Sequence, residues 1–195
     1  MSKAANVSCR RSTLPRGFTV IELLAVVTLL AILLAIAAPG FQTLVTRSRA
    51  ASLGNEFVLG VSFARAEAIS RNKCVTMCVA NDLMADAPQC VASNGDWNSG
   101  WIIFSNPKCD DVSTNSTAEL LKVYVGDASG PTLVGTATPR TIRFDSQGRA
   151  NIANPIALKV SPPGESATKM VCMDLMGRTR IGNADSISCD GSNRN

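Results

Sequence analysis

The sequence predicts an α+β fold, in which one long amino-terminal helix packs on a mainly antiparallel β-sheet. Two observations carry this prediction. Residues 18–38 are almost all apolar, and apolar residues then recur at spacings of three and four as far as Arg71. Beyond Asn72 the segments shorten and the apolar spacing changes to two, as in strands that have one covered face.

The apolar segment 18–38 is long enough to span a membrane. Its 21 residues would form a helix about 31 Å long, which matches the hydrocarbon core of a bilayer. Basic residues precede the segment and none follows it before Arg47, so the positive-inside rule places the amino terminus in the cytoplasm and the remainder outside. The basic residues before the segment are Lys3, Arg10, Arg11 and Arg16. They account for the whole net charge of +4.

Glu22 decides between three interpretations of this segment: a cleaved secretory signal, a plain membrane anchor and a prepilin-type segment. A secretory signal has no reason to carry a carboxylate inside its apolar region. A glutamate in hydrocarbon costs roughly 2–3 kcal/mol or more, so it needs a cationic partner. Cleavage between Gly17 and Phe18 would create such a partner, the new α-amino group.

The residues from Arg16 to Leu24 resemble the class III signal of type IV pilins and type II secretion pseudopilins. The resemblance implies that a prepilin peptidase cleaves after Gly17 and that Phe18 is N-methylated. It also implies assembly into a filament through the apolar helix, with Glu22 neutralising the terminal amine of a neighbouring subunit. Pilins tolerate a helix kink where Pro39 stands. The protein would then lie in the bacterial inner membrane as a single-pass protein with a periplasmic head.

These boundaries define the expected organisation of the chain. Residues 1–17 form a leader, 18–38 a membrane-spanning and assembly helix, 39–71 its continuation, and 72–195 a β-rich head. Within the continuation, Gly54 and Gly60 lower helix stability, so we expect close packing or partial melting there. The expected strands are residues 74–80, 100–105, 120–125, 141–145, 155–160, 170–175 and 178–181, with polar loops at 81–99 and 106–118. We find no internal repeat.

Six cysteines remain after removal of the leader, which contains Cys9. An even number in an oxidising compartment favours disulfides, and six cysteines allow 15 pairings. Proximity in sequence favours Cys172 with Cys189 and Cys78 with Cys90, which leaves Cys74 with Cys109.

The chain contains no histidine, which excludes Ser-His-Asp and Cys-His catalysis and histidine-containing metal sites. No CxxC pair and no nucleotide-binding loop are present either. We therefore expect no enzyme activity, no metal, no cofactor and no small-molecule substrate.

Two further elements resemble FimT/GspH-type minor pilins. The stretch from Trp97 to Phe104 matches their W-x-x-G-W-x-x-F pattern, which opens a core strand. Gly177, Arg178, Thr179 and Arg180 resemble the G-R-x-R element that binds DNA in FimT-type pilins.

The G-R-x-R resemblance implies DNA binding by Arg178 and Arg180, with Gly177 supplying the turn. On one strand these arginines would project from the same face, about 7 Å apart, and could engage successive phosphates. Lys169 and Arg143 are candidate auxiliaries by charge alone. The alternative is that the two arginines are exposed and pair with Asp174 or Asp185.

The sequence thus predicts a minor pilin of a type IV pilus that primes or caps filament assembly and binds DNA non-specifically for uptake in natural transformation. Its other partners would be pilin or pseudopilin subunits. The alternative is the H-type minor pseudopilin of a type II secretion system, which would contact pseudopilins and not DNA.

Overall fold

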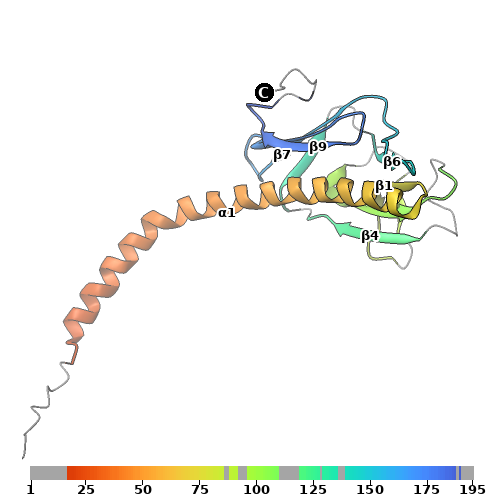
Figure 1. Ribbon diagram of the computed structural model, residues 1–195. Coiled ribbons are helices and arrows are strands. Elements are labelled where there is room, and N and C mark those ends of the chain that lie inside the picture. The colour runs from red at the N-terminus through yellow and green to blue at the C-terminus, as the bar shows by residue number, and fades with distance from the viewer. Residues whose placement is uncertain are drawn as a thin grey trace, which may run out of the picture. The chain divides into compact units, whose positions relative to one another are not determined.

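A computed structural model describes residues 17–85, 88–91, 96–109, 119–127, 129–135, 139–187 and 189. The chain divides into two compact units, Met1–Gln42 and Thr43–Asn195. Helix α1 (Val20–Arg71) runs through residues of both, and Figure 1 shows the order of the elements along the chain. The expected leader lies outside the described residues, apart from Gly17.

In the amino-terminal unit, α1 presents apolar side chains to its surroundings on every side. Phe18 is 77% exposed, and the described side chains of the apolar segment 18–38 are all exposed. By its length and composition, α1 is long and apolar enough to cross a membrane. Glu22 lies in the first turn, where its backbone N–H donates to the carbonyl oxygen of Thr19 (3.1 Å). The helix continues through Pro39, which does not end it.

In the head, one face of α1 is buried. The buried residues recur at the predicted spacings of three and four: Ala50, Leu53, Phe57, Val61, Ala64 and Ala68. The helix ends at Arg71, as the sequence predicted. Gly54 and Gly60 are sites of close packing: a Cβ on Gly54 would lie 2.7 Å from Cδ1 of Ile181, and one on Gly60 would lie 3.1 Å from Nε1 of Trp101.

The strands form two antiparallel sheets where the sequence suggested one. The first has the order β2-β1-β3-β4, with β6 also pairing with β1. The second has the order β5-β7-β8-β9. The strands of the first sheet are β1 (Val75–Asn81), β2 (Gln89–Cys90), β3 (Gly100–Ser105), β4 (Leu120–Val125) and β6 (Thr141–Phe144). Those of the second are β5 (Thr132–Gly135), β7 (Ile156–Ser161), β8 (Lys169–Met173) and β9 (Thr179–Asn183).

Seven of these strands overlap the predicted ones, whereas β2 and β5 were missed. Strand β2 lies in the expected loop 81–99 and has only two residues, which pair with the end of β1 beside the Cys78–Cys90 disulfide. A short helical turn, η1 (Trp97–Ser99), also interrupts that loop. Strand β5 has four residues, and the Leu133 N–H donates to the side-chain oxygen of Asn98. Such short segments are defined by non-local partners and have no period of their own.

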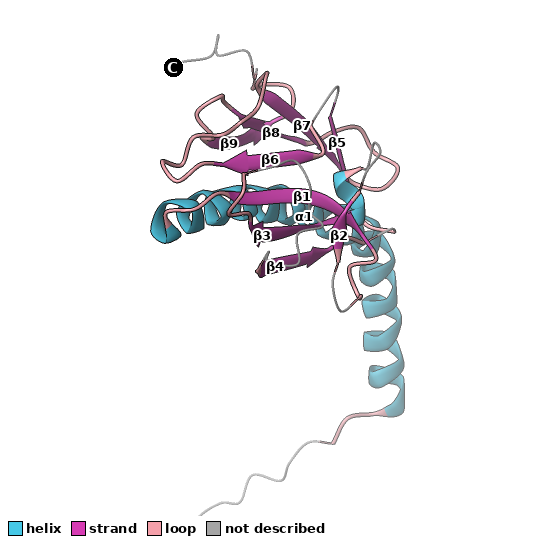
Figure 2. Cartoon of the chain, turned by 90° about the vertical axis from the view of Figure 1, so that its right-hand side faces the viewer, coloured by secondary structure: helices cyan, strands magenta, loops and turns pink. Residues whose placement is uncertain are grey.

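Both sheets and α1 share one hydrophobic core. Figure 2 shows β1 and β3 of the first sheet in front of the carboxyl-terminal part of α1 and the strands of the second sheet above it. The Phe57 ring packs edge-on against Trp97 and Trp101, with ring centroids 5.1 and 5.6 Å away. Leu158 and Val171 of the second sheet belong to the same core. The Trp97–Phe104 stretch therefore supplies core residues, as its resemblance implied.

Three disulfides link the six cysteines of the head. They join Cys74 to Cys109, Cys78 to Cys90 and Cys172 to Cys189, which is the pairing that sequence proximity favoured. The first joins the residue before β1 to the segment after β3, and the second joins the middle of β1 to β2. The third ties the residues after β9 to β8.

Candidate functional site

The residues around Arg178 form a tight turn that connects β8 to β9. One carboxylate oxygen of Asp174, Oδ1, accepts hydrogen bonds from the backbone N–H groups of Met176 and Arg178, both at 2.9 Å. The other oxygen, Oδ2, accepts from Nε of Arg178 at 3.0 Å. The backbone closes the turn, because the Gly177 N–H donates to the Asp174 carbonyl at 2.9 Å. Arg178 therefore forms the ion pair with Asp174 that the alternative interpretation predicted.

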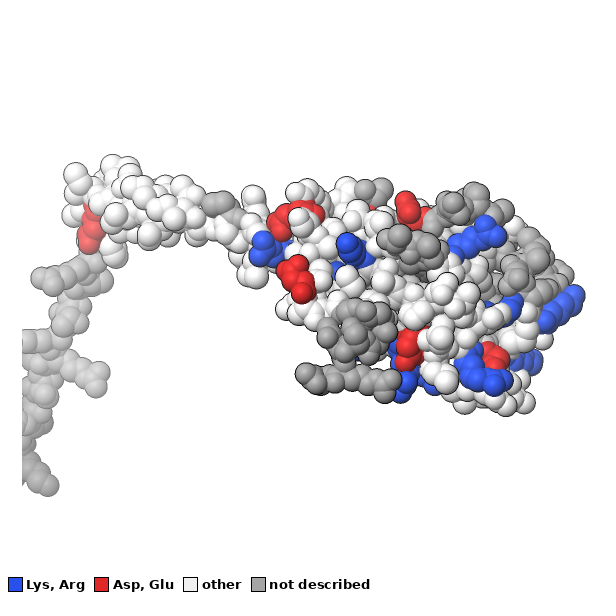
Figure 3. All heavy atoms as spheres, turned by 90° about the horizontal axis from the view of Figure 1, so that it is seen from above, with Lys and Arg blue, Asp and Glu red and all other residues white. Residues whose placement is uncertain are grey.

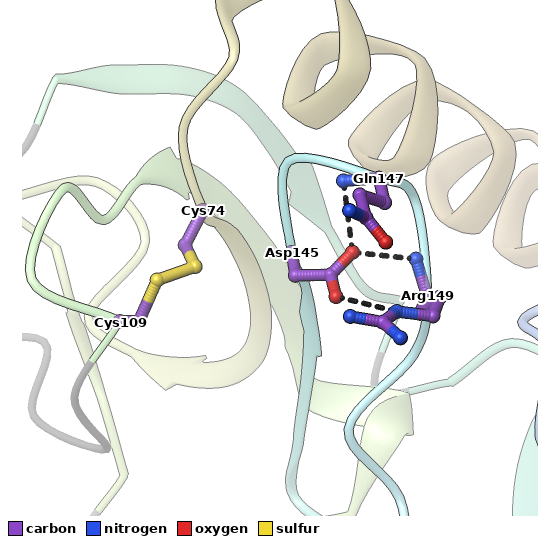
Figure 4. A network of polar contacts seen from close by, with 5 residues as sticks. All are labelled: Cys74, Cys109, Asp145, Gln147 and Arg149. Atoms are coloured by element: carbon purple, nitrogen blue, oxygen red, sulfur yellow. Dashed lines mark hydrogen bonds and ion pairs between the residues drawn. A yellow bond between two sulfur atoms is a disulfide. The ribbon is translucent and has the colours of Figure 1, made fainter.

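A second turn has the same construction. Asp145 accepts backbone hydrogen bonds from Gln147 and Arg149, both at 2.9 Å, and its Oδ2 accepts from Nε of Arg149 at 2.9 Å. Figure 4 shows this network beside the Cys74–Cys109 disulfide. The two turns share the pattern D-x-x-G-R, at residues 145–149 and 174–178. This shared motif is a local turn pattern of five residues, so it is not an internal repeat of a structural unit.

Each aspartate is held in its charged form. Partial burial raises the pKa of Asp174, but hydrogen bonds from the backbone and side chain of Arg178 and from the Met176 N–H outweigh it. The pKa of Asp174 is therefore lowered from its ordinary value. The pKa of Asp145 is lowered in the same way by Arg149 and Gln147. Each arginine is consequently anchored through Nε, while the side chains of Arg149 and Arg178 remain 67% and 73% exposed.

The two turns are packed together and against α1. A Cβ on Gly177, whose φ is +73°, would lie 2.6 Å from Cε1 of the buried Phe144 ring. A Cβ on Gly148, which has the same φ, would lie 2.6 Å from Cδ1 of Ile69 and 3.2 Å from Nε of Arg65. Only glycine fits both this backbone conformation and this space. Arg149 and Arg178 of the two turns and Arg65 of α1 therefore lie at one end of the head.

Arg178 and Arg180 line the same open cavity of about 530 Å³. Its other walls include the Cys172–Cys189 disulfide and the exposed side chains of Leu175 and Met176. Arg180 lies on β9, whereas Arg178 precedes that strand, since its backbone N–H and carbonyl are both bonded to Asp174. The sequence predicted that both arginines lie on one strand. In the structure only Arg180 lies on a strand, but both arginines line one cavity.

The two proposed auxiliaries are placed differently. Arg143, on β6, lines a neighbouring cavity of about 420 Å³ together with Arg149, Leu175 and Met176. Lys169 lies at the opposite end of the β8–β9 pair, opposite Asn183, to whose side-chain oxygen it donates at 2.7 Å. The structure therefore groups Arg143 with the turns and does not group Lys169 with them.

Sequence reasoning missed two arginines of this surface. Arg149 could have been found from the repeated D-x-x-G-R pattern. Arg65 carries no such signal, because it lies on α1 and reaches the turns only through the tertiary fold. Figure 3 shows basic side chains gathered at the end of the head on the right of the view, with acidic side chains among them.

Residues at the expected cleavage site are exposed. Gly17 and Phe18 precede α1, and Glu22 follows in its first turn. In the part of the chain that the structure describes, no group of three or more cysteine, aspartate or glutamate side chains is arranged to hold a metal ion.

Comparison with known proteins gives two family matches. The family described as Type II transport protein GspH matches residues 53–177, and the Prokaryotic N-terminal methylation motif matches residues 15–38. The GspH match ends at Gly177, so Arg178 and Arg180 lie beyond it. No curated protein matches the sequence significantly.

Among solved structures, the chain is similar to the type IV minor pilin FimU of Pseudomonas aeruginosa in two crystal forms. One has a TM-score of 0.53 and 18% identity over 73% of this chain and 96% of FimU. The other has a TM-score of 0.49 and 17% identity over 71% and 98% of the two chains. The first shows that the fold is pilin-like. Together with the GspH match, which covers more than half of the sequence, this shows that the chain is a pilin-like protein belonging to the GspH family and carrying the N-terminal methylation motif.

Proposed function

We propose that this protein is a non-enzymatic minor pilin that enters a filament through the apolar part of α1. The observation that supports this is the exposure of every described apolar side chain in residues 18–38 of the isolated chain. Such a surface must be covered by lipid or by neighbouring helices. In this proposal a prepilin peptidase cleaves after Gly17 in the cytoplasm, the head lies in the periplasm, and the methylated amine of Phe18 is neutralised by Glu22 of a neighbouring subunit.

Mass spectrometry of the membrane fraction tests the processing step. We expect a mature chain that begins with methylated Phe18; an amino terminus near Ala38 would instead indicate a cleaved secretory signal and overturn the proposal. Glu22→Gln should leave cleavage intact but reduce incorporation into sheared filaments, because the terminal amine loses its counter-charge. Normal incorporation of this variant would contradict the role of Glu22.

We further propose that the end of the head binds DNA non-specifically during uptake in natural transformation, through Arg178 and Arg180. Support comes from their shared exposed cavity and from the anchoring of Arg178 by Asp174. Anchoring through Nε fixes the plane of the guanidinium and leaves its terminal nitrogens for a phosphate, so less side-chain entropy is lost on binding. Asp174 also offsets part of the positive charge, which makes weak and salt-dependent affinity the expected behaviour.

A titration of duplex DNA against salt tests this proposal. Loss of two phosphate contacts should reduce the slope of log affinity against log salt concentration (the salt slope) by about 2, and should lower the affinity roughly 60-fold near 0.1 M salt. The double variant Arg178→Ala, Arg180→Ala should show this loss. The matched control is Lys122→Ala, Lys159→Ala, which removes two exposed charges that line neither the 530 Å³ nor the 420 Å³ cavity. Equal affinities for the two double variants would contradict the assignment.

The second candidate function is the H-type minor pseudopilin of a type II secretion system, favoured by the GspH family match. Its partners would be other pseudopilins. No binding of the unmodified chain to DNA at low salt would favour this alternative. Arg178 would then serve only to close its turn with Asp174, and Arg180 would be an exposed residue of β9.

A further inference from the structure

An open groove of about 490 Å³ lies between α1 and the turn that contains Arg178. Its helix side consists of Ser62, Arg65, Ala66 and Ile69, and its turn side consists of Gly177, Arg178 and Thr179. None of these lining residues is acidic. The groove is thus bordered by two guanidinium groups that come from distant parts of the sequence.

The donors of this groove suit an oxyanion. The Ser62 hydroxyl donates to the Val58 carbonyl oxygen at 2.8 Å, so the donors left for a ligand are Arg65, Arg178 and the Thr179 hydroxyl. Arginine guanidinium groups present paired N–H donors in a geometry that matches phosphate oxygens. Two such groups across one groove can hold a phosphate from opposite sides.

Arg65 carries the uncompensated charge of the groove. Its guanidinium forms no ion pair with any residue in the described part of the chain, whereas Arg178 shares its charge with Asp174. Arg65 is also half-buried beside the D-x-x-G-R turn at residues 145–149, where its Nε would lie 3.2 Å from a Cβ on Gly148. A half-buried side chain has fewer rotamers to lose when it binds a ligand.

We infer that this groove is a phosphate-binding site in which Arg65 is the principal, previously unassigned residue. Arg178 lines both this groove and the cavity that contains Arg180, so the three arginines form a continuous path for a polyanion. The inference rests on the proposed DNA-binding function, and it extends the contact surface from the turn onto α1. The recognised chemistry is a phosphate group, supplied by a nucleic-acid backbone or by free phosphate.

The test compares Arg65→Gln with Arg49→Gln in the full chain in a non-ionic detergent. Arg49 is the matched control because it is an exposed arginine of the same helix that does not line the groove. Duplex DNA is titrated at several salt concentrations, and circular dichroism verifies the fold of each variant. One lost phosphate contact should weaken binding about eightfold near 0.1 M salt and lower the salt slope by about 1. Arg49→Gln should remain within about twofold of the parent.

A second arm uses inorganic phosphate, followed by the NMR shift of the Thr179 amide. If the parent binds DNA and the two glutamine variants do not differ, the inference is overturned while the proposed DNA binding stands. If the parent fails to bind DNA but phosphate shifts Thr179 in the parent and not in Arg65→Gln, the groove is supported and the DNA-binding function is overturned. Absence of both responses overturns both.

Discussion

Substitution of Gly177 by alanine tests how the turn that carries Arg178 is built. Gly177 has a φ of +73°, and a Cβ there would lie 2.6 Å from Cε1 of Phe144 and 3.3 Å from Cβ of Ala150. Phe144 is fully buried in the shared core, so its ring cannot turn aside without disturbing its neighbours. Gly177→Ala should therefore introduce both backbone strain and overpacking.

The expected cost follows from these two contributions. A left-handed backbone costs an L-residue about 1–2 kcal/mol, and overpacking a close-packed core costs about 1–3 kcal/mol. The lower conformational entropy of the unfolded alanine chain offsets about 0.4–1 kcal/mol. Gly177→Ala should thus lower the free energy of unfolding by about 3 kcal/mol.

Gly164 is the matched control. It has the same φ of +73°, but nothing lies within 4 Å of the position that a Cβ would occupy. Gly164→Ala should therefore cost only the net backbone strain, about 1 kcal/mol. Gly148→Ala should fall between the two, because its Cβ would meet Ile69, a half-exposed side chain that can move aside.

Urea denaturation of the compact unit Thr43–Asn195 with its disulfides intact measures these differences. With a slope of about 2 kcal/mol per molar urea, the midpoints of Gly177→Ala and Gly164→Ala should differ by about 1 M. Equal midpoints would refute the reasoning, since they would show that the Phe144 contact contributes nothing. Loss of DNA binding by Gly177→Ala without loss of stability would instead indicate that the glycine contacts the ligand.

The remaining predictions also concern the stability of the head. Folding lowers the pKa values of Asp145 and Asp174, so their charged forms stabilise the head at neutral pH. This stabilisation is lost as the pH falls through about 4 towards the pKa values of the folded state. The double variant Asp145→Asn, Asp174→Asn should therefore show a shallower decline of the free energy of unfolding between about pH 5 and about pH 2. In an exposed helix, Gly54→Ala would raise the free energy of unfolding by about 1 kcal/mol. Here a Cβ would lie 2.7 Å from Cδ1 of Ile181, and the overpacking outweighs that gain. Thermal denaturation should therefore show a net loss of about 1 kcal/mol. Replacing Cys172 and Cys189 by serine removes a cross-link with a sequence separation of 17, which should lower the urea midpoint by the equivalent of about 3 kcal/mol; an unchanged midpoint would contradict the chain-entropy argument.

Features that depend on local periodicity could be predicted from the amino-acid sequence alone. The apolar run 18–38 and the spacing of Ala50, Phe57 and Ala64 predicted α1 and its buried face, because a helical period is a property of neighbouring residues. Longer strands such as β3 and β7 were recognisable for the same reason. The disulfide pairing also followed from proximity, since two of the three bridges close short loops.

Features that depend on contacts between residues far apart in the chain became visible only in the folded structure. The division into two sheets and the strands β2 and β5 follow from pairing partners that no local pattern identifies. Gly177 needs its small size because Phe144, from the other sheet, occupies the adjacent space. Arg65 and Arg178 share a groove only because α1 and the β8–β9 turn pack on the same core, and such a meeting depends on the path of the whole chain.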